Sequence, residues 1–168
     1  MRNHRKTAAA LVATALLGVA AAGTAQASSG TAGAAAPSAC RPANHLAKIT
    51  PAPGSAGHHH YRVTLTAPRG YQSCELAGSP IQVRFSQHGV DRGITAGRYG
   101  EQGTRVTFGP GHPVHFDVQI PSAAPGTPAD EASFTLRAPG GEIPGTSVAA
   151  GALTVAPGTL VGPVRRGA

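Results

Sequence analysis

Residues 113–120 read PVHFDVQI, and this stretch decides the fold class of the chain. Apolar and polar side chains alternate through it, with apolar residues at positions 114, 116, 118 and 120. Successive side chains of a β-strand point to opposite faces of a sheet, whereas an α-helix repeats every three or four residues. The alternation therefore predicts a strand with one face in a core and the other in water.

The same period of two recurs on both sides of this stretch. We expect further strands over 44–50, 58–67, 81–85, 106–108, 134–136 and 153–155. Nearly every one is bounded by Gly or Pro, which supply the backbone angles of turns. The turn signals are Pro53-Gly54, Pro68-Arg69-Gly70, Gly109-Pro110-Gly111, Pro125-Gly126, Pro139-Gly140-Gly141 and Pro157-Gly158. Short strands with one polar face and frequent turns predict an all-β sandwich of about seven to eight strands.

The composition supports a single folded domain. The 168 residues include 23 Gly and 15 Pro, but only 12% are charged, and this low charge argues against a charge-rich disordered chain. A coiled coil is excluded because such chains are rich in Glu, Lys, Leu and Arg, and this chain is not. Aromatic residues make up 4%, so the core must depend on Val, Leu, Ile and Ala together with four Phe.

The first 27 residues have the three parts of a secretory signal peptide. Basic residues at positions 2, 5 and 6 precede an uncharged apolar run over 7–23, and Ala25-Gln26-Ala27 forms a small-x-small cleavage site. The alternative is a transmembrane anchor, but this run is short for a bilayer and rich in Ala and Gly. We therefore predict cleavage after Ala27, secretion, and no stable membrane anchor in the mature chain.

The mature chain then divides into three parts. Residues 28–39 are Ala, Gly and Ser without periodicity, which predicts a flexible leader. The sandwich domain is expected over 40–160, and a flexible basic tail over 161–168, around Arg165-Arg166. Cleavage leaves 11 basic and 7 acidic residues, so part of the net charge of +7 belongs to the signal peptide.

The chain has two cysteines, Cys40 and Cys74. Secretion places them in an oxidising compartment, which favours a disulfide, with a free or metal-bound thiol pair as the alternative. If 44–50 and 58–67 pair antiparallel, Cys40 precedes the first strand and Cys74 follows the second. Both cysteines then lie at the same end of the sandwich. A disulfide closing a loop of roughly 35 residues stabilises a fold by about 3.8 kcal/mol in the chain-entropy model.

Several segments also carry a family resemblance. They are Cys40 near the mature start, Gly57-His58-His59-His60-Tyr61 before a strand, Cys74-Glu75-Leu76-Ala77-Gly78-Ser79-Pro80, Gly109-Pro110-Gly111 and Val155-Ala156-Pro157. Together they resemble a secreted actinobacterial family, domain of unknown function 4232, over roughly residues 40–160. The resemblance implies an immunoglobulin-like antiparallel β-sandwich and implies no catalytic residue. The chain departs from the family pattern in lacking an aromatic between Gly78 and Pro80, and an Asn-containing turn at 67–70.

Four histidines are candidate metal ligands: His58, His60, His112 and His115. His58 and His60 share one face of a strand, and imidazole is a common ligand of zinc and copper. If 58–67 pairs with 113–120, however, His60 lies opposite about residue 120 and roughly 17 Å from His115. Copper-binding sandwiches usually add Met ligands, and Met1 is lost with the signal peptide. We expect these histidines to be solvent-exposed, and a His-based copper or zinc protein is the alternative.

Other activities have less support in the sequence. The seven acidic residues are scattered without a carboxylate pair, and no Gly-x-Ser-x-Gly elbow is present. No cofactor motif is found, and a nucleic-acid face would need aromatics among its basic residues. We expect a secreted, non-catalytic module, extracellular or wall-associated. An anionic cell-wall polymer or another secreted protein fits its basic charge.

Overall fold

The computed structural model of the protein describes residues 35–168, and these residues form an all-β structure. The expected signal peptide and residues 28–34 of the leader lie outside the described residues. A single 3-10 turn, η1 (Pro42–Asn44), is the one helical element of the described part. No helix among these residues is long and apolar enough to cross a membrane.

The described residues contain more strands than the seven or eight expected. Several additional strands have only two residues, too few for a period of two to be visible in the sequence. The fourteen strands are β1 (Leu46–Ser55), β2 (His58–Thr66), β3 (Cys74–Ala77), β4 (Ile81–Gln87), β5 (Val90–Thr95), β6 (Gly97–Arg98), β7 (Arg105–Phe108), β8 (Val114–Pro121), β9 (Thr127–Thr135), β10 (Arg137–Ala138), β11 (Gly141–Glu142), β12 (Ser147–Val155), β13 (Leu160–Val161) and β14 (Arg165–Arg166).

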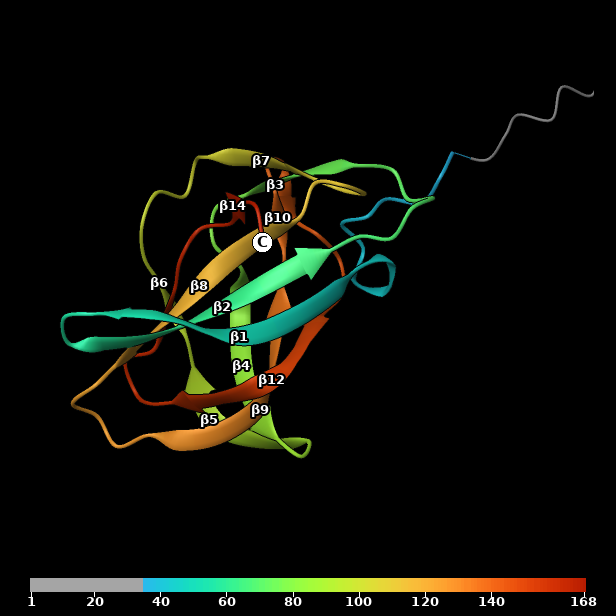
Figure 1. Ribbon diagram of the computed structural model, residues 1–168. Helices are drawn as coiled ribbons and strands as arrows, with labels where there is room; N and C mark the ends of the chain where they lie inside the picture. Colours follow the sequence, from blue (N-terminus) through green and yellow to red (C-terminus); the bar gives the residue numbers. More distant parts are fainter. Residues whose placement is uncertain (1–34) are drawn as a thin grey trace, which may run out of the picture. The chain divides into compact units, whose positions relative to one another are not determined.

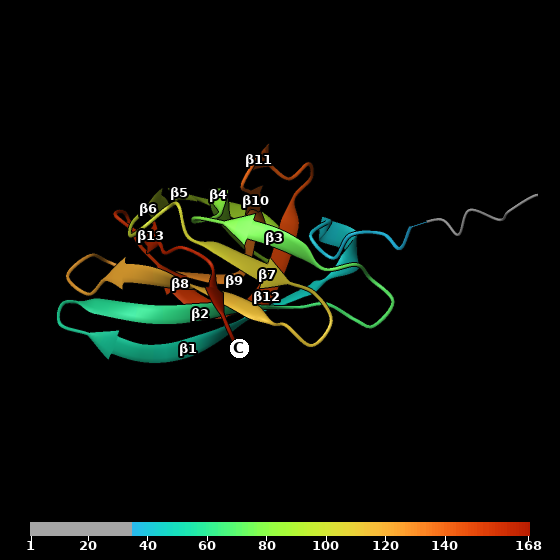
Figure 2. The same cartoon turned by 90° about the horizontal axis from the view of Figure 1, so that it is seen from above.

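Ten of these strands form one strongly curved sheet. Its order is β5-β4-β9-β12-β1-β2-β8-β13-β6, and β14 pairs with β8 beside this path. The chain passes from the first edge strand, β5, to the last, β6, through Ala96 alone, so the sheet nearly closes on itself. Figures 1 and 2 show two layers, with β1, β2 and β8 in one layer and, in the other, β4 and β5 of the same sheet together with β3 of a separate two-stranded sheet formed with β7.

The family resemblance implied an antiparallel sandwich, but the sheet also contains parallel pairs. β1 pairs parallel with β12, and β13 pairs parallel with β6. β1 lies between β2, its hairpin partner, and β12, which begins about a hundred residues later. A period of two indicates that a segment is a strand. It does not indicate whether a strand distant in sequence pairs with it parallel or antiparallel.

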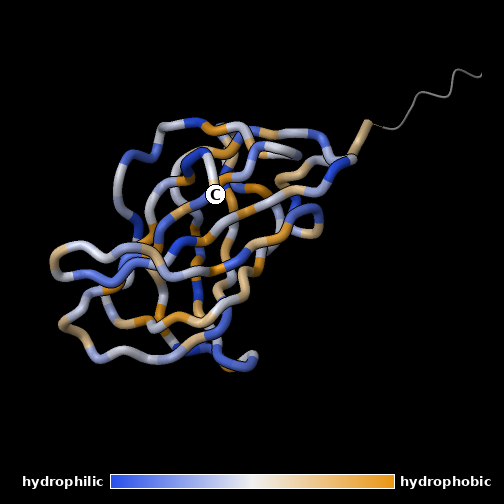
Figure 3. Tube along the Cα trace, viewed as in Figure 1, coloured by the Kyte–Doolittle hydropathy of each residue, from blue (hydrophilic) through white to orange (hydrophobic). Residues whose placement is uncertain are grey.

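The stretch 113–120 has the predicted role at the centre of the molecule. β8 alternates buried and half-buried residues without a break, and its four apolar side chains are at most 2% exposed. Phe116 packs edge-on against Phe134 of β9, with ring centroids 5.1 Å apart. Figure 3 shows the same alternation as a change of hydropathy along the strands. Burial of each such side chain contributes about 1.5–3 kcal/mol.

One predicted turn lies inside a strand. β1 continues through Pro53-Gly54 to Ser55, with a break in its pairing to β2 between Ala52 and Ser55. The reversal occurs instead at Ala56-Gly57, where Gly57 has φ +78°. Pro is tolerated in this strand where its missing N–H is not needed for the ladder, as at a bulge.

The expected flexible tail over 161–168 is part of the fold. Val161 and Val164 are 0% and 3% exposed, and Arg165 pairs with His115 through β14. The folded region also begins before residue 40, because Ala39 is fully buried and its N–H donates to the Gln72 carbonyl. The exposed Arg165-Arg166 pair resembled a solvated tail, but the valines before it provide enough apolar surface to hold the segment against β8.

Candidate functional site

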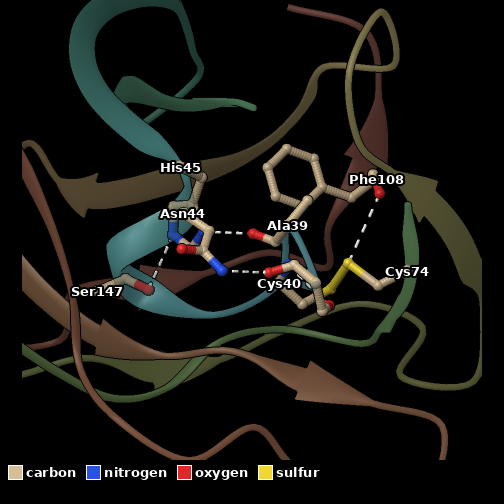
Figure 4. The surroundings of a disulfide bond; sticks show 8 residues. Ala39, Cys40, Asn44, His45, Cys74, Phe108 and Ser147 are labelled. Carbon is tan, nitrogen blue, oxygen red and sulfur yellow. Dashed lines mark hydrogen bonds between the residues drawn. A yellow bond between two sulfur atoms is a disulfide. The ribbon is translucent and has the colours of Figure 1, made fainter. Parts of the chain in front are cut away.

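The disulfide fastens the start of the domain to β3. Cys40 and Cys74 are bonded, with their Cα atoms 6.0 Å apart. β1 and β2 pair antiparallel, so Cys40, which precedes β1, and Cys74, which follows β2, lie at the same end of the sheet. This confirms both the predicted bond and the geometric reason for it. Figure 4 shows the bond beside Phe108, whose carbonyl oxygen lies 3.6 Å from Cys74 Sγ.

His45 occupies the interior next to this disulfide. Its Nδ1 lies 2.9 Å from the Ala39 carbonyl oxygen and its Nε2 lies 3.0 Å from Ser147 Oγ (Figure 4). A carbonyl oxygen can only accept, so Nδ1 carries the proton and Ser147 donates to Nε2. The ring also meets Phe108 edge-on at 5.6 Å. Burial lowers the pKa of His45 below its usual value, and this favours the neutral ring.

His45 was not among the candidate residues from the sequence, although the strand pattern around it contains a signal. Alternation over 44–50 places residue 45 on the same face as Ala47 and Ile49, the apolar face of the strand. A histidine in phase with apolar residues is expected to be buried and therefore to need hydrogen-bond partners.

The contact between His45 and Ser147 has the chemistry of a base and a hydroxyl nucleophile. Their exposed fractions are only 8% and 2%, however, so the hydroxyl does not reach solvent or an incoming substrate. What the pair does accomplish is to tie η1 and the N-terminal segment to the first residue of β12. We interpret it as a structural bracket.

Residues 74–80, one of the segments that carry the family resemblance, have a clear structural role. They carry the chain from the small sheet of β3 and β7 into β4 of the main sheet. Gln102 fastens this crossover, because its Oε1 accepts from Ser79 N–H at 2.8 Å and its Nε2 donates to Ser79 Oγ at 3.0 Å. Gly78 has φ +68°, and a Cβ added there would lie 2.8 Å from the Gln102 carbonyl oxygen. The glycine is therefore required by both conformation and space.

The structure groups the four candidate histidines into two separate pairs. The rings of His58 and His60 lie 6.5 Å apart at the end of the β1–β2 hairpin. His112 and His115 lie at the opposite end of the β2–β8 ladder, where His115 Nδ1 donates to the Gly167 carbonyl at 3.0 Å. His60 is opposite Gln119, one residue from the expected position, and His115 is opposite Thr64. Four residues of strand separate the pairs by roughly 14 Å.

Neither pair has a third ligand in the described residues. No group of three or more His, Cys, Asp or Glu side chains able to hold a metal occurs within 35–168. Asp117, two positions from His115, is engaged by Arg62, with Nε and Oδ1 3.5 Å apart. His60 Nε2 is engaged by Ser55 Oγ at 2.9 Å. A protein zinc site normally has three or four protein ligands, so the metal-binding alternative would rest on two-ligand contacts.

A basic row crosses the outer face of the sheet. Strand register places Lys48 of β1 opposite Thr64 of β2, Thr64 opposite His115 of β8, and His115 opposite Arg165 of β14. Paired residues project from the same face of a sheet, and this face is opposite the core. Three basic side chains distant in sequence thus share one surface. The sequence lacks any local signal for this, because the row depends on the position of β14.

No family model, no curated protein and no solved structure matches this chain. The resemblance of segments within 40–160 to domain of unknown function 4232 therefore stays a prediction from the sequence.

Proposed function

We propose that this protein is a secreted, non-catalytic β-sandwich module that acts outside the cell or attached to the cell wall. The observation that carries the proposal is the Cys40–Cys74 disulfide. Disulfides persist in oxidising compartments and are rare where glutathione and thioredoxin keep thiols reduced. The disulfide is therefore in accord with the signal peptide predicted over residues 1–27.

The surroundings of the disulfide support a lasting structural bond. Cys40 is 4% exposed, which limits access of a reducing thiol to its sulfur. The bond and the His45 bracket together hold the N-terminal segment at two points, against β3 and β12. These two attachments suit a domain that must stay folded without intracellular chaperones. They also leave the outer faces of the strands free to contact other molecules.

Expression of the whole chain in an actinobacterial host tests the proposal. Mass spectrometry of the culture medium, the wall fraction and the cytoplasm should find the protein outside the cell, beginning at Ser28 and lacking two hydrogen masses. A matched variant with Ala25 and Ala27 both changed to Leu should be retained unprocessed. Full-length protein with free thiols in the cytoplasm would overturn the proposal. Purified protein that turns over ester, glycoside or peptide substrates would overturn its non-catalytic part.

A further inference from the structure

We propose that the outer face around Lys48, Thr64, His115 and Arg165, here called the cationic face, binds a linear phosphodiester polymer of the polyol-phosphate type. The inference rests on the proposed location outside the cell and adds the ligand class and the residues that recognise it. Four observations carry it: the strand register, the distribution of charge, a cavity beside Lys48, and a second cavity around the sheet edge.

The register aligns the cationic face across four adjacent strands. Neighbouring strands lie about 4.8 Å apart, so Lys48 and Arg165, three strands apart, place their Cα atoms roughly 14 Å from each other. Thr64 and His115 fill the positions between them. Such an arrangement presents a continuous row of donors on the convex face of the sheet to an extended chain, and does not enclose a compact ligand.

Charge is segregated along the same row. Beyond Lys48, the row of paired residues continues across the sheet through Ala150, Glu131, Ser86 and Asp91. The two acidic residues of the row therefore lie on the far side of Lys48 from Arg165. Among residues 35–168, the two Arg–carboxylate ion pairs are Arg62–Asp117 and Arg84–Asp91, and His88 Nε2 lies 3.6 Å from Asp130 Oδ2.

The consequence for the cationic face is an excess of positive charge. Neither Lys48 nor Arg165 has a carboxylate partner in the described part of the chain. The nearest carboxylate along β8 is Asp117, which Arg62 neutralises. Anionic groups are therefore attracted to the part of the row around Lys48 and Arg165.

A cavity of about 300 Å³ adjoins Lys48. Three threonines, Thr50, Thr64 and Thr66, line it together with Leu46, which is 71% exposed. Hydroxyl donors beside an aliphatic surface suit the carbon backbone and hydroxyls of a polyol, with Lys48 at the edge to receive a flanking phosphate. A bare phosphate ion would leave the apolar part of this cavity unused.

The row continues around the edge formed by β14. Arg166, the neighbour of Arg165, lines a second cavity of about 420 Å³ with His112, Thr107 and Gly111. The guanidinium group matches phosphate by paired hydrogen bonds, and this favours a phosphodiester. Stacking aromatics, which single-stranded nucleic acids require, do not occur at the named positions of the face.

The test uses the mature oxidised protein and purified poly(glycerol phosphate) as the probe. Calorimetry at 0.15 M salt should detect binding, and the variant Lys48→Gln/Arg165→Gln should weaken it at least tenfold. Arg41→Gln/Arg98→Gln is the matched control, because it removes the same charge from exposed side chains that lie outside the face and have no carboxylate partner among the described residues, and it should change the affinity less than twofold. All three proteins should have the same melting temperature, since the side chains are exposed.

Three outcomes would overturn the inference. Equal loss of affinity in both variants would mean generic electrostatics without a defined face. Tighter binding of a polyuronate or of single-stranded DNA at the same salt would assign the face to another class of polyanion. Lack of binding to poly(glycerol phosphate) would remove the ligand class. The proposed extracellular role would survive each of them, because secretion and processing are measured separately.

Discussion

Ser147 Oγ lies 3.0 Å from His45 Nε2, although 102 positions separate the two residues in the chain. The other ring nitrogen of His45 donates to the Ala39 carbonyl, so one buried imidazole connects the N-terminal segment to β12. Both contacts as assigned require a neutral ring. The stability of the domain should therefore depend on pH.

Acidification should destabilise the protein through His45. Burial lowers the folded-state pKa of His45, so the unfolded chain binds the proton first as the pH falls. The stabilisation is complete above about pH 6.5, the ordinary value of His, and is lost as the pH falls through the lowered folded-state pKa. Urea unfolding at pH 7.5, 6.5 and 5.5 should show a steeper dependence for the wild type than for His45→Gln. His115→Gln, an outer-face control, should keep the wild-type slope; equal slopes in all three proteins would refute the role of His45.

Loss of the disulfide should cost about 4 kcal/mol, because the bond closes a loop of 34 residues in the unfolded chain. The double variant Cys40→Ser/Cys74→Ser should unfold at a lower urea concentration than the oxidised protein, with the same far-UV circular dichroism in the absence of urea. Reduction of the wild type should reproduce the loss. If the variant and the oxidised protein unfolded at the same midpoint, the bond would make no net contribution to stability.

Substitution at Gly78 should be costlier than substitution at Gly57. The two glycines have similar positive φ values, +68° and +78°, but a Cβ at Gly57 meets nothing within 4 Å, whereas one at Gly78 collides with Gln102. Gly57→Ala should lose about 1 kcal/mol for the backbone conformation alone. Gly78→Ala should lose about 1–3 kcal/mol more, because the crossover must shift. Thermal unfolding of both variants gives the difference, and a difference near zero would contradict the close contact.

The C-terminal segment should contribute to stability. Val164 is 3% exposed and Val148 is 49% exposed, so the two valines are a matched pair for truncation. Val164→Ala should lose about 2 kcal/mol through lost burial and an added cavity, while Val148→Ala should change stability by less than about 0.5 kcal/mol. Equal small effects, measured by chemical unfolding, would indicate a loosely attached segment.

Metal affinity should be weak. His58 and His60 offer two imidazoles, and no third His, Cys, Asp or Glu joins them in the described residues. Calorimetry with Zn²⁺ and Cu²⁺ should therefore show no submicromolar binding. The variant His58→Ala/His60→Ala tests this pair, and His112→Ala/His115→Ala is its control. Submicromolar binding lost only in the first variant would favour the metal-binding alternative over a simple module.

The sequence was informative wherever a pattern was local. Alternation over 113–120 predicted β8 and its buried face. The expected secretion predicted the disulfide, and the positions of the cysteines beside 44–50 and 58–67 agreed with it. β5 was missed because Val90–Thr95 buries little and its residues do not alternate clearly. Burial of Val164 was missed because the charges at 165–166 outweighed one valine in the local pattern.

The sequence by itself determined the all-β class and the disulfide, because the class depends on side-chain period and the two cysteines flank a hairpin. The β2–β8 pairing, found within one residue of the expected register, was taken from the immunoglobulin-like arrangement that the resemblance implies. Only the tertiary structure decided the parallel placement of β1 beside β12, the His45–Ser147 contact and the cationic face. Each of these brings together residues from strands far apart in the chain. Their proximity depends on how the sheet curves and where β14 pairs with β8, and no spacing along the chain contains that information.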